Sequence, residues 1–223
     1  MDFKKLQEPL PIESIDFRVQ SINNGGYATI LAYKDARVDM NRLNEVCGVL
    51  GWKRRHTRDN KNCIVSVWDD ANKQWVEKED TGSESNAEAQ KGLASDSFKR
   101  ACFNLGIGIE LYDYPIIQVK LNDNEWEVKE YQGKKFPKAT YNLKLKEWVW
   151  KSQFTDGKLN YLSCIDDKGT TRFTYGKFNL PTLVKDSKEW KGALSKKTTI
   201  DVLRKYFVIT EENEKIYCEF LNK

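Results

Sequence analysis

The sequence lacks any apolar run long enough to cross a membrane. Hydrophobic residues make up 39% and charged residues 31% of the 223-residue chain, which is ordinary for a water-soluble globular protein. No stretch approaches the roughly 18 consecutive apolar residues of a transmembrane helix. The first residues, MDFKKLQEPLPIES, have no apolar core and no small-residue cleavage site of a secretory signal. We therefore expect a cytoplasmic protein.

Cysteine and histidine are too few and too scattered for a metal site. The five cysteines form no C-x-x-C pair, and His56 is the only histidine. An odd number of cysteines without framework spacing is typical of reduced, buried thiols. A zinc site is not expected.

Nucleotide-binding motifs are also missing. No G-x-x-x-x-G-K-[ST] loop occurs, which argues against a strand-exchange ATPase. Gly106-Ile107-Gly108 follows an expected helix instead of opening one, so it is no dinucleotide fingerprint. We expect no cofactor.

The net charge of +4 is unevenly distributed. Residues 1–112 hold 16 Lys+Arg against 17 Asp+Glu, and residues 113–223 hold 21 against 16. A front half without net charge can bind a polyanion only through local basic clusters, because contacts with phosphates act within roughly 10 Å.

The front half is expected to contain five strands and two helices. Asn23-Asn24-Gly25-Gly26 predicts a hairpin turn, and Asp35 and Gly48 predict the ends of a first helix. The capping-box spacing of residues 85–88 and Gly106 bound a longer second helix. The strands are expected at Ile15–Ile22, Tyr27–Tyr33, Gly51–His56, Asn62–Trp68 and Gln74–Asp80.

The second helix is predicted to have one buried and one exposed face. At about 100° per residue, Ala87, Ala94, Phe98, Ala101 and Leu105 share the buried arc. The opposite side carries Asp96, Lys99, Arg100 and Phe103.

The rear half is harder to interpret. Strands are expected at Tyr141–Trp150, Leu159–Ile165 and Thr170–Tyr175, with short helices at Thr182–Leu194 and Thr198–Phe207. Its tryptophans either fill a small β core or form contacts with partners.

Three segments in order resemble the Rad52 family of single-strand annealing proteins, particularly its phage members. They are YKDARVDMNRLNEVCGVLGW at Tyr33–Trp52, a middle sheet, and KGLASDSFKRACFNLG at Lys91–Gly106. FRVQ at Phe17–Gln20 also resembles the strand before the first hairpin in phage annealing proteins of this group. The resemblance runs from about Phe17 to Tyr112. It implies an α+β fold, in which an antiparallel sheet packs on helices (a β-β-β-α core), with a β-rich C-terminal appendage. Residues 1–112 would form the core that binds DNA and oligomerises, and 113–223 a basic, Trp-rich extension.

The resemblance also implies that single-stranded DNA lies in a basic groove of a ring or helical arc. Lys99 and Arg100 would hold the phosphates, a contact that ignores base sequence. Taken alone, these two side chains would more simply be a solvated helix face that suits the helix dipole.

Further groove candidates vary in strength. Arg18, Arg37 and Tyr33 occupy positions that match the family, although Arg37 could equally form an internal ion pair. Phe103 replaces a basic residue and is a candidate for base stacking or a subunit contact. The remaining candidates are Lys91, beside the buried arc, and Lys53 and Arg55 in a basic hairpin that could offer an outer DNA path.

The sequence therefore predicts ATP-independent binding and annealing of single-stranded DNA in recombination or repair, without covalent chemistry. A phage-encoded protein acting in a bacterial host is expected, with a host single-strand binding protein as a partner of the C-terminal part. A passive single-strand binder is the first alternative. A magnesium-dependent nuclease using Asp123, Glu127 and Lys129 is the second, although such acidic-x-lysine triplets also arise by chance.

Overall fold

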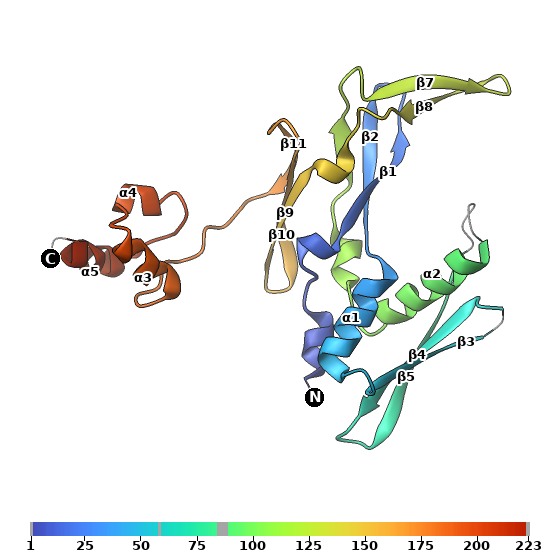
Figure 1. Ribbon diagram of the computed structural model, residues 1–223, viewed down its shortest axis with the longest axis horizontal. Helices are drawn as coiled ribbons and strands as arrows, with labels where there is room; N and C mark the ends of the chain where they lie inside the picture. Colours follow the sequence, from blue (N-terminus) through green and yellow to red (C-terminus); the bar gives the residue numbers. More distant parts are fainter. Residues whose placement is uncertain (1, 58, 84–88, 222–223) are drawn as a thin grey trace. The chain divides into compact units, whose positions relative to one another are not determined.

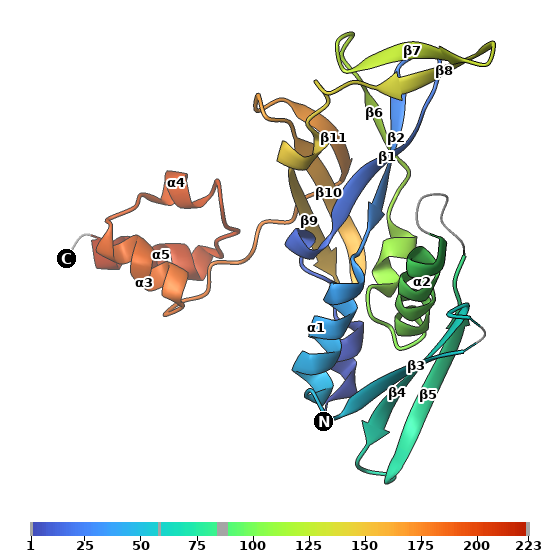
Figure 2. The same ribbon diagram turned by 45° about the vertical axis from the view of Figure 1, so that its right-hand side comes forward.

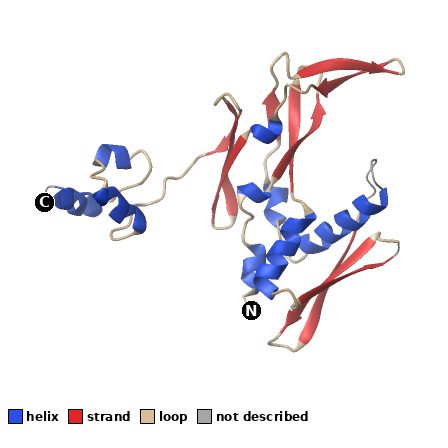
Figure 3. Ribbon diagram, in the orientation of Figure 1, coloured by secondary structure: helices blue, strands red, loops and turns tan. Residues whose placement is uncertain are grey.

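The structure, a computed structural model, describes residues 2–57, 59–83 and 89–221, without the side chains of residues 89–91. It is an α+β protein in which all pairs of named strands are antiparallel (Figure 3). The chain divides into two compact units, Met1–Gly176 and Lys177–Lys223, and the boundary predicted at residue 112 falls inside the first. No helix in the described ranges is long and apolar enough to cross a membrane.

The first hairpin follows its turn residues. Strands β1 (Asp16–Ile22) and β2 (Tyr27–Tyr33) pair directly. The side-chain oxygen of Asn23 accepts hydrogen bonds from the N–H groups of Gly25 at 2.9 Å and Tyr27 at 3.0 Å. This side-chain cap closes the turn, as the sequence predicts.

Helix α1 (Ala36–Cys47) has the predicted ends. The Asp35 carboxylate accepts a hydrogen bond from the N–H of Arg37 at 2.8 Å, the usual role of an N-cap. Gly48 ends the helix with φ of 73°, a conformation that side chains with a Cβ rarely adopt. The cap fixes where β2 passes into α1.

A three-stranded meander carries the second helix. Strands β3 (Trp52–Thr57), β4 (Asn62–Asp69) and β5 (Gln74–Thr81) pair in order, and helix α2 (Ala89–Phe103) packs on one face of this sheet (Figures 1 and 2). All four elements confirm the sequence interpretation, although the capping box of residues 85–88 lies outside the described residues.

Gly82 permits the close approach of β5 to α2. A Cβ atom at this position would lie 2.6 Å from the carbonyl oxygen of Leu93 and 2.7 Å from the nitrogen of Ser97. Any other residue would push the sheet away from the helix.

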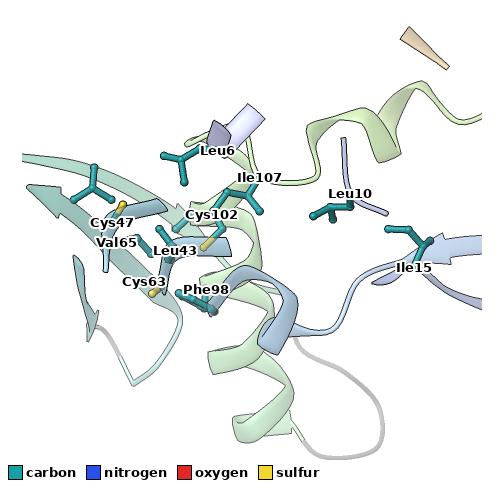
Figure 4. Close-up of a cluster of buried hydrophobic side chains, with 12 residues drawn as sticks. Leu6, Leu10, Ile15, Leu43, Cys47, Cys63, Val65, Phe98, Cys102 and Ile107 are labelled. Atoms are coloured by element: carbon teal, nitrogen blue, oxygen red, sulfur yellow. The ribbon is translucent and has the colours of Figure 1, made fainter. Parts of the chain in front are cut away.

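The first core lies between α1, α2 and this sheet (Figure 4). Phe98 and Ala101 of α2 are fully buried, as predicted, and Phe98 stacks on Trp52 with ring centroids 6.1 Å apart. Trp52 donates a hydrogen bond to the side chain of Asn44 at 2.7 Å. Trp52 therefore packs within the core.

A second core lies between two sheets. Strand β6 (Ile117–Lys120) joins β2 to complete the β1–β2–β6 sheet, whose apolar face packs against another antiparallel sheet. The rings of Phe17 and Trp150 stack across this interface at 3.6 Å. The other sheet consists of β9 (Val149–Thr155), β10 (Lys158–Ile165) and β11 (Thr171–Gly176).

A separate hairpin, β7 (Trp126–Tyr131) and β8 (Lys134–Ala139), was not predicted. Gln132 and Gly133 form its two-residue turn with φ of 51° and 73°. Two consecutive positive φ angles are the signature of a type I′ turn.

The strand predicted over Tyr141–Trp150 is wrong for most of its length. The segment instead forms a turn and a 3-10 helix, Leu145–Glu147, before β9 begins at Val149. The side chains of Thr140 and Asn142 donate hydrogen bonds to the carbonyl oxygen of Asn124 at 2.6 and 3.0 Å. These bonds hold the chain in a turn despite the alternating pattern.

The second unit has a core of its own. Helices α3 (Lys188–Ser195), α4 (Ile200–Leu203) and α5 (Glu211–Leu221) surround Trp190 and Tyr217, whose rings meet edge-on at 5.1 Å. The two predicted helices are present but shorter, and α5 was not predicted.

A buried ion-pair network joins β11 to the base of the β7–β8 hairpin. Arg172 donates to Glu125 at 2.7 and 3.0 Å and to Asp166 at 3.1 Å. All three side chains are less than 10% exposed. The guanidinium also lies 4.7 Å from the Trp148 ring. The network fixes the hairpin base to the second sheet.

Replacing Arg172 by Met should lower the free energy of unfolding of the first unit by about 3–5 kcal/mol, because two buried carboxylates lose their counter-charge. Chemical denaturation followed by circular dichroism measures this. Lys144→Ala, which removes an exposed pair with Glu147, is the control and should change stability by less than about 1 kcal/mol. Equal effects of the two substitutions would contradict the assignment.

Candidate nucleic-acid interface

Helix α2 carries two neighbouring basic side chains, Lys99 and Arg100, that differ in exposure. Arg100 is exposed, and its Nε donates to Asp80 of β5 at 3.2 Å. Asn104 donates to the same carboxylate at 3.2 Å. Lys99 is half-buried, and its charge acts on Asp35 at the start of α1. Arg100 is therefore held in place by β5.

The first turn of α1 adds a third cation. Arg37 is 80% exposed at its side chain and donates from Nε to Asp35 at 2.8 Å. Hydrogen bonds from Arg37 lower the pKa of Asp35, and the Lys99 charge lowers it further. A cation of α1 and one of α2 thus both act on the carboxylate of Asp35.

Strands β1 and β2 carry further charged side chains near the start of α1. Asp16 pairs with Tyr33 across the β1–β2 ladder, and the Arg18 guanidinium lies 5.7 Å from the Tyr33 ring. Asp35 raises the pKa of Arg37 most, and Asp16 contributes at longer range. The end of β2 therefore lies next to the start of α1, and Arg18 of β1 lies beside Tyr33 at this end of β2.

We call these residues the basic strip. The strip combines residues of β1, β2 and α1, which follow one another in the sequence, with residues of the more distant α2. Several of its cations lie close to carboxylates, so the strip offers positioned hydrogen-bond donors more than bulk positive charge. Its members are Arg18, Tyr33, Arg37, Lys99 and Arg100.

Phe103 was predicted to be exposed but is half-buried. The Lys34 ammonium lies 4.0 Å from the centroid of its ring, and the ring of Tyr112 packs at 4.9 Å. These two contacts cover much of the Phe103 ring, although the helical wheel predicts it on the exposed side of α2.

The remaining candidates do not join the strip. Trp52 and Arg54 of β3 face Phe98 of α2, so the alternating Lys53 and Arg55 point to the other side of the sheet. There Lys53 lies 4.1 Å from the ring of Trp75. The side chain of Lys91 lies outside the described residues.

A buried lysine, Lys34, is absent from the residues predicted for the site. Lys34 is 2% exposed; it forms an ion pair with Asp39 of α1 and donates to the carbonyl oxygen of Ile107 at 2.6 Å. The strand pattern could have predicted this burial. Every second residue of β2 faces the core, as Ala28 and Ile30 do, and the same alternation continues to Lys34. This one ammonium joins β2, α1 and the segment after α2.

Asp39 is completely buried, and burial raises its pKa to about 6 although the Lys34 charge opposes this. One of its oxygens, Oδ2, has no hydrogen-bond partner within the described part of the chain. The carboxylate therefore depends strongly on its single cation.

The residues of the nuclease alternative form no recognisable metal site. Lys129 pairs with Glu127 at 3.1 Å on the exposed β7 strand. Among residues 2–57, 59–83 and 89–221, no group of three or more His, Cys, Asp or Glu side chains is placed to hold a metal ion.

Residues 3–130 match the family described as "Rad52/22 family double-strand break repair protein". The chain belongs to this Rad52/22 family. The matched range contains the whole basic strip and the first core. It confirms the resemblance that the sequence motifs indicated.

One curated relative is the single-stranded DNA-binding protein DdrA of Deinococcus radiodurans. It is 32% identical over 115 residues, which cover 50% of this chain and 55% of DdrA. The alignment thus spans about half the length of each protein.

Replacing Lys34 by Met should destabilise the first unit by about 3–5 kcal/mol at neutral pH, because Asp39 loses its cation. Without Lys34 the pKa of folded Asp39 rises further, so the loss should shrink as the pH falls and the carboxyl is protonated. Adding Asp39→Asn should recover most of the stability. Denaturation at several pH values tests this, and a loss that grows toward low pH would contradict it.

Proposed function

We propose that this Rad52/22-family chain binds single-stranded DNA along the basic strip and anneals complementary strands without ATP or magnesium. The observation that carries the proposal is that three elements, β1, α1 and α2, supply four cations, each beside Tyr33 or within reach of a carboxylate: Arg18, Arg37, Lys99 and Arg100. Cations fixed in this way bind phosphates irrespective of base sequence. The reaction needs no covalent bond to form or break.

The DdrA similarity supports single-strand binding, because that relative is named for it. Passive binding is therefore the competing function. The two differ in outcome, since a passive binder holds single strands without speeding their pairing.

We further propose that the protein acts as a homo-oligomer, a ring or an arc, in which the strips of successive subunits form one path. Light scattering of the purified protein tests this, and a monomer at working concentration would contradict it. Lys53 and Arg55 face away from α2 and lie outside this path. Phe103 would act at the edge of the strip.

The helical unit Lys177–Lys223 is the proposed contact for a host single-strand binding protein. It carries 10 Lys+Arg against 7 Asp+Glu, and apolar side chains such as Tyr206 and Val208 are more than half exposed. A phage-encoded protein working in the bacterial cytoplasm fits this partner. If the full chain does not bind the host single-strand binding protein in a titration, this proposal is refuted.

The annealing test mixes two labelled complementary oligonucleotides with neither ATP nor magnesium. The wild-type protein should accelerate pairing, and Lys99→Ala with Arg100→Ala should abolish the gain. For single strands the slope of log affinity against log salt should fall by about 1.4, roughly 0.7 for each lost phosphate contact.

The matched control is Lys53→Ala with Arg55→Ala, which removes the same charge from the other face of the β3–β4–β5 sheet. It should retain most of the annealing rate. Tight binding by the wild-type protein with no acceleration would establish passive binding instead. Equal loss in both double variants would refute the assignment to the strip.

A further inference from the structure

One side of the β7–β8 hairpin combines exposed aromatic side chains with lysines. Cross-strand pairs place side chains of directly opposite residues on the same side of the ribbon. One side carries the pairs Glu127–Lys138, Lys129–Phe136 and Tyr131–Lys134. We call this side the hairpin face.

The aromatic and basic groups of the hairpin face are open to solvent. Tyr131 is 67% exposed and Phe136 is 41% exposed. Glu127, the one acidic residue, pairs with Lys129 at 3.1 Å. Lys134 and Lys138, both exposed, supply the surplus positive charge.

The hairpin is held rigidly at its base. A Cβ at Gly26 would lie 2.7 Å from the Trp126 ring, so β7 starts in close contact with the β1–β2 turn. Glu125, one residue earlier, is fixed by Arg172. With the type I′ turn at its tip, the ribbon presents its side chains in a preformed arrangement, which reduces the entropy lost on binding.

The hairpin face lies away from the basic strip. Trp126 meets the turn end of the β1–β2 hairpin, whereas Tyr33 ends the seven-residue strand β2, roughly 20 Å from that turn. Figure 1 shows β7 and α1 at opposite ends of β1 and β2. The family match ends at residue 130, before the turn and β8. The match therefore includes Glu127 and Lys129 of the hairpin face, whereas both its aromatic residues and Lys134 and Lys138 lie beyond it.

We propose that the hairpin face is a second contact for single-stranded DNA, in which bases stack on Tyr131 and Phe136 while Lys134 and Lys138 bind phosphates. This extends the proposed function. Exposed aromatics beside lysines suit a polyanion with planar bases. A protein partner is disfavoured, because charged residues, lysine in particular, are depleted in the cores of protein interfaces.

The stacking test measures affinity for a labelled oligonucleotide by fluorescence anisotropy, using the full chain. Tyr131→Ala with Phe136→Ala should weaken binding about fivefold or more. The same variant should bind an abasic oligonucleotide of equal length as the wild type does. Val128→Ala, an exposed apolar residue on the opposite side of the ribbon, is the control and should have no effect.

The charge test separates phosphate contacts from a folding defect. Lys134→Ala and Lys138→Ala should each reduce the salt slope by about 0.7, while Lys135→Ala, on the opposite side, should not. Equal slopes for all three variants, or unchanged affinity in the aromatic variant, would overturn the inference. If the variants change the oligomer mass but neither the affinity nor the salt slope, the hairpin face is a contact between copies of the chain and the inference is overturned.

These outcomes are separable from failure of the proposed function. If wild-type protein binds and anneals but the hairpin variants behave like it, only the hairpin contact is refuted. If wild-type protein binds no single-stranded DNA, the proposed function fails first.

Discussion

A single buried ammonium group holds the candidate interface together. Lys34, at the end of β2, contacts Asp39 of α1, the carbonyl oxygen after α2 and the ring of Phe103. A charge in this position is tolerated only because its hydrogen-bond partners are themselves fixed. The same contacts set the spacing between β2, α1 and α2, and so the spacing of the cations above them.

The basic strip depends on position more than on total charge. Arg37 and Arg100 are oriented by Asp35 and Asp80, and the front half of the chain has almost no net charge. Such a surface should hold a phosphate backbone in one path and release it readily as salt rises. An annealing protein requires this combination, since it must hold a strand and then give it up to the duplex.

Local signals predicted the elements that carry the strip. Asp35 and Gly48 mark the ends of α1, and the spacing of Phe98 and Ala101 marks the buried face of α2. The burial of Phe103 could not be predicted, because residues outside α2 cover its ring. Lys34 is remote in sequence, and Tyr112 lies beyond the end of the helix. Burial of this kind is set by packing between elements and leaves little trace in a helical wheel.

Non-local hydrogen bonds account for the difference at Tyr141–Trp150. Alternation over Tyr141–Trp150 favoured a strand, but side-chain bonds to Asn124 hold its first part in a turn. The β7–β8 ribbon was missed, although Gln132-Gly133 is a two-residue turn between strand-like segments. The grouping of strands into two facing sheets also requires pairings between segments far apart in the chain.

The most direct test of the central claim is photochemical cross-linking of the wild-type protein to a single-stranded oligonucleotide, with the linked peptides identified by mass spectrometry. The account predicts linked peptides from the end of β2 that contain Tyr33, and from α2 that contain Lys99. Cross-links confined to the peptide with Lys53 and Arg55, with none at Tyr33 or Lys99, would contradict it.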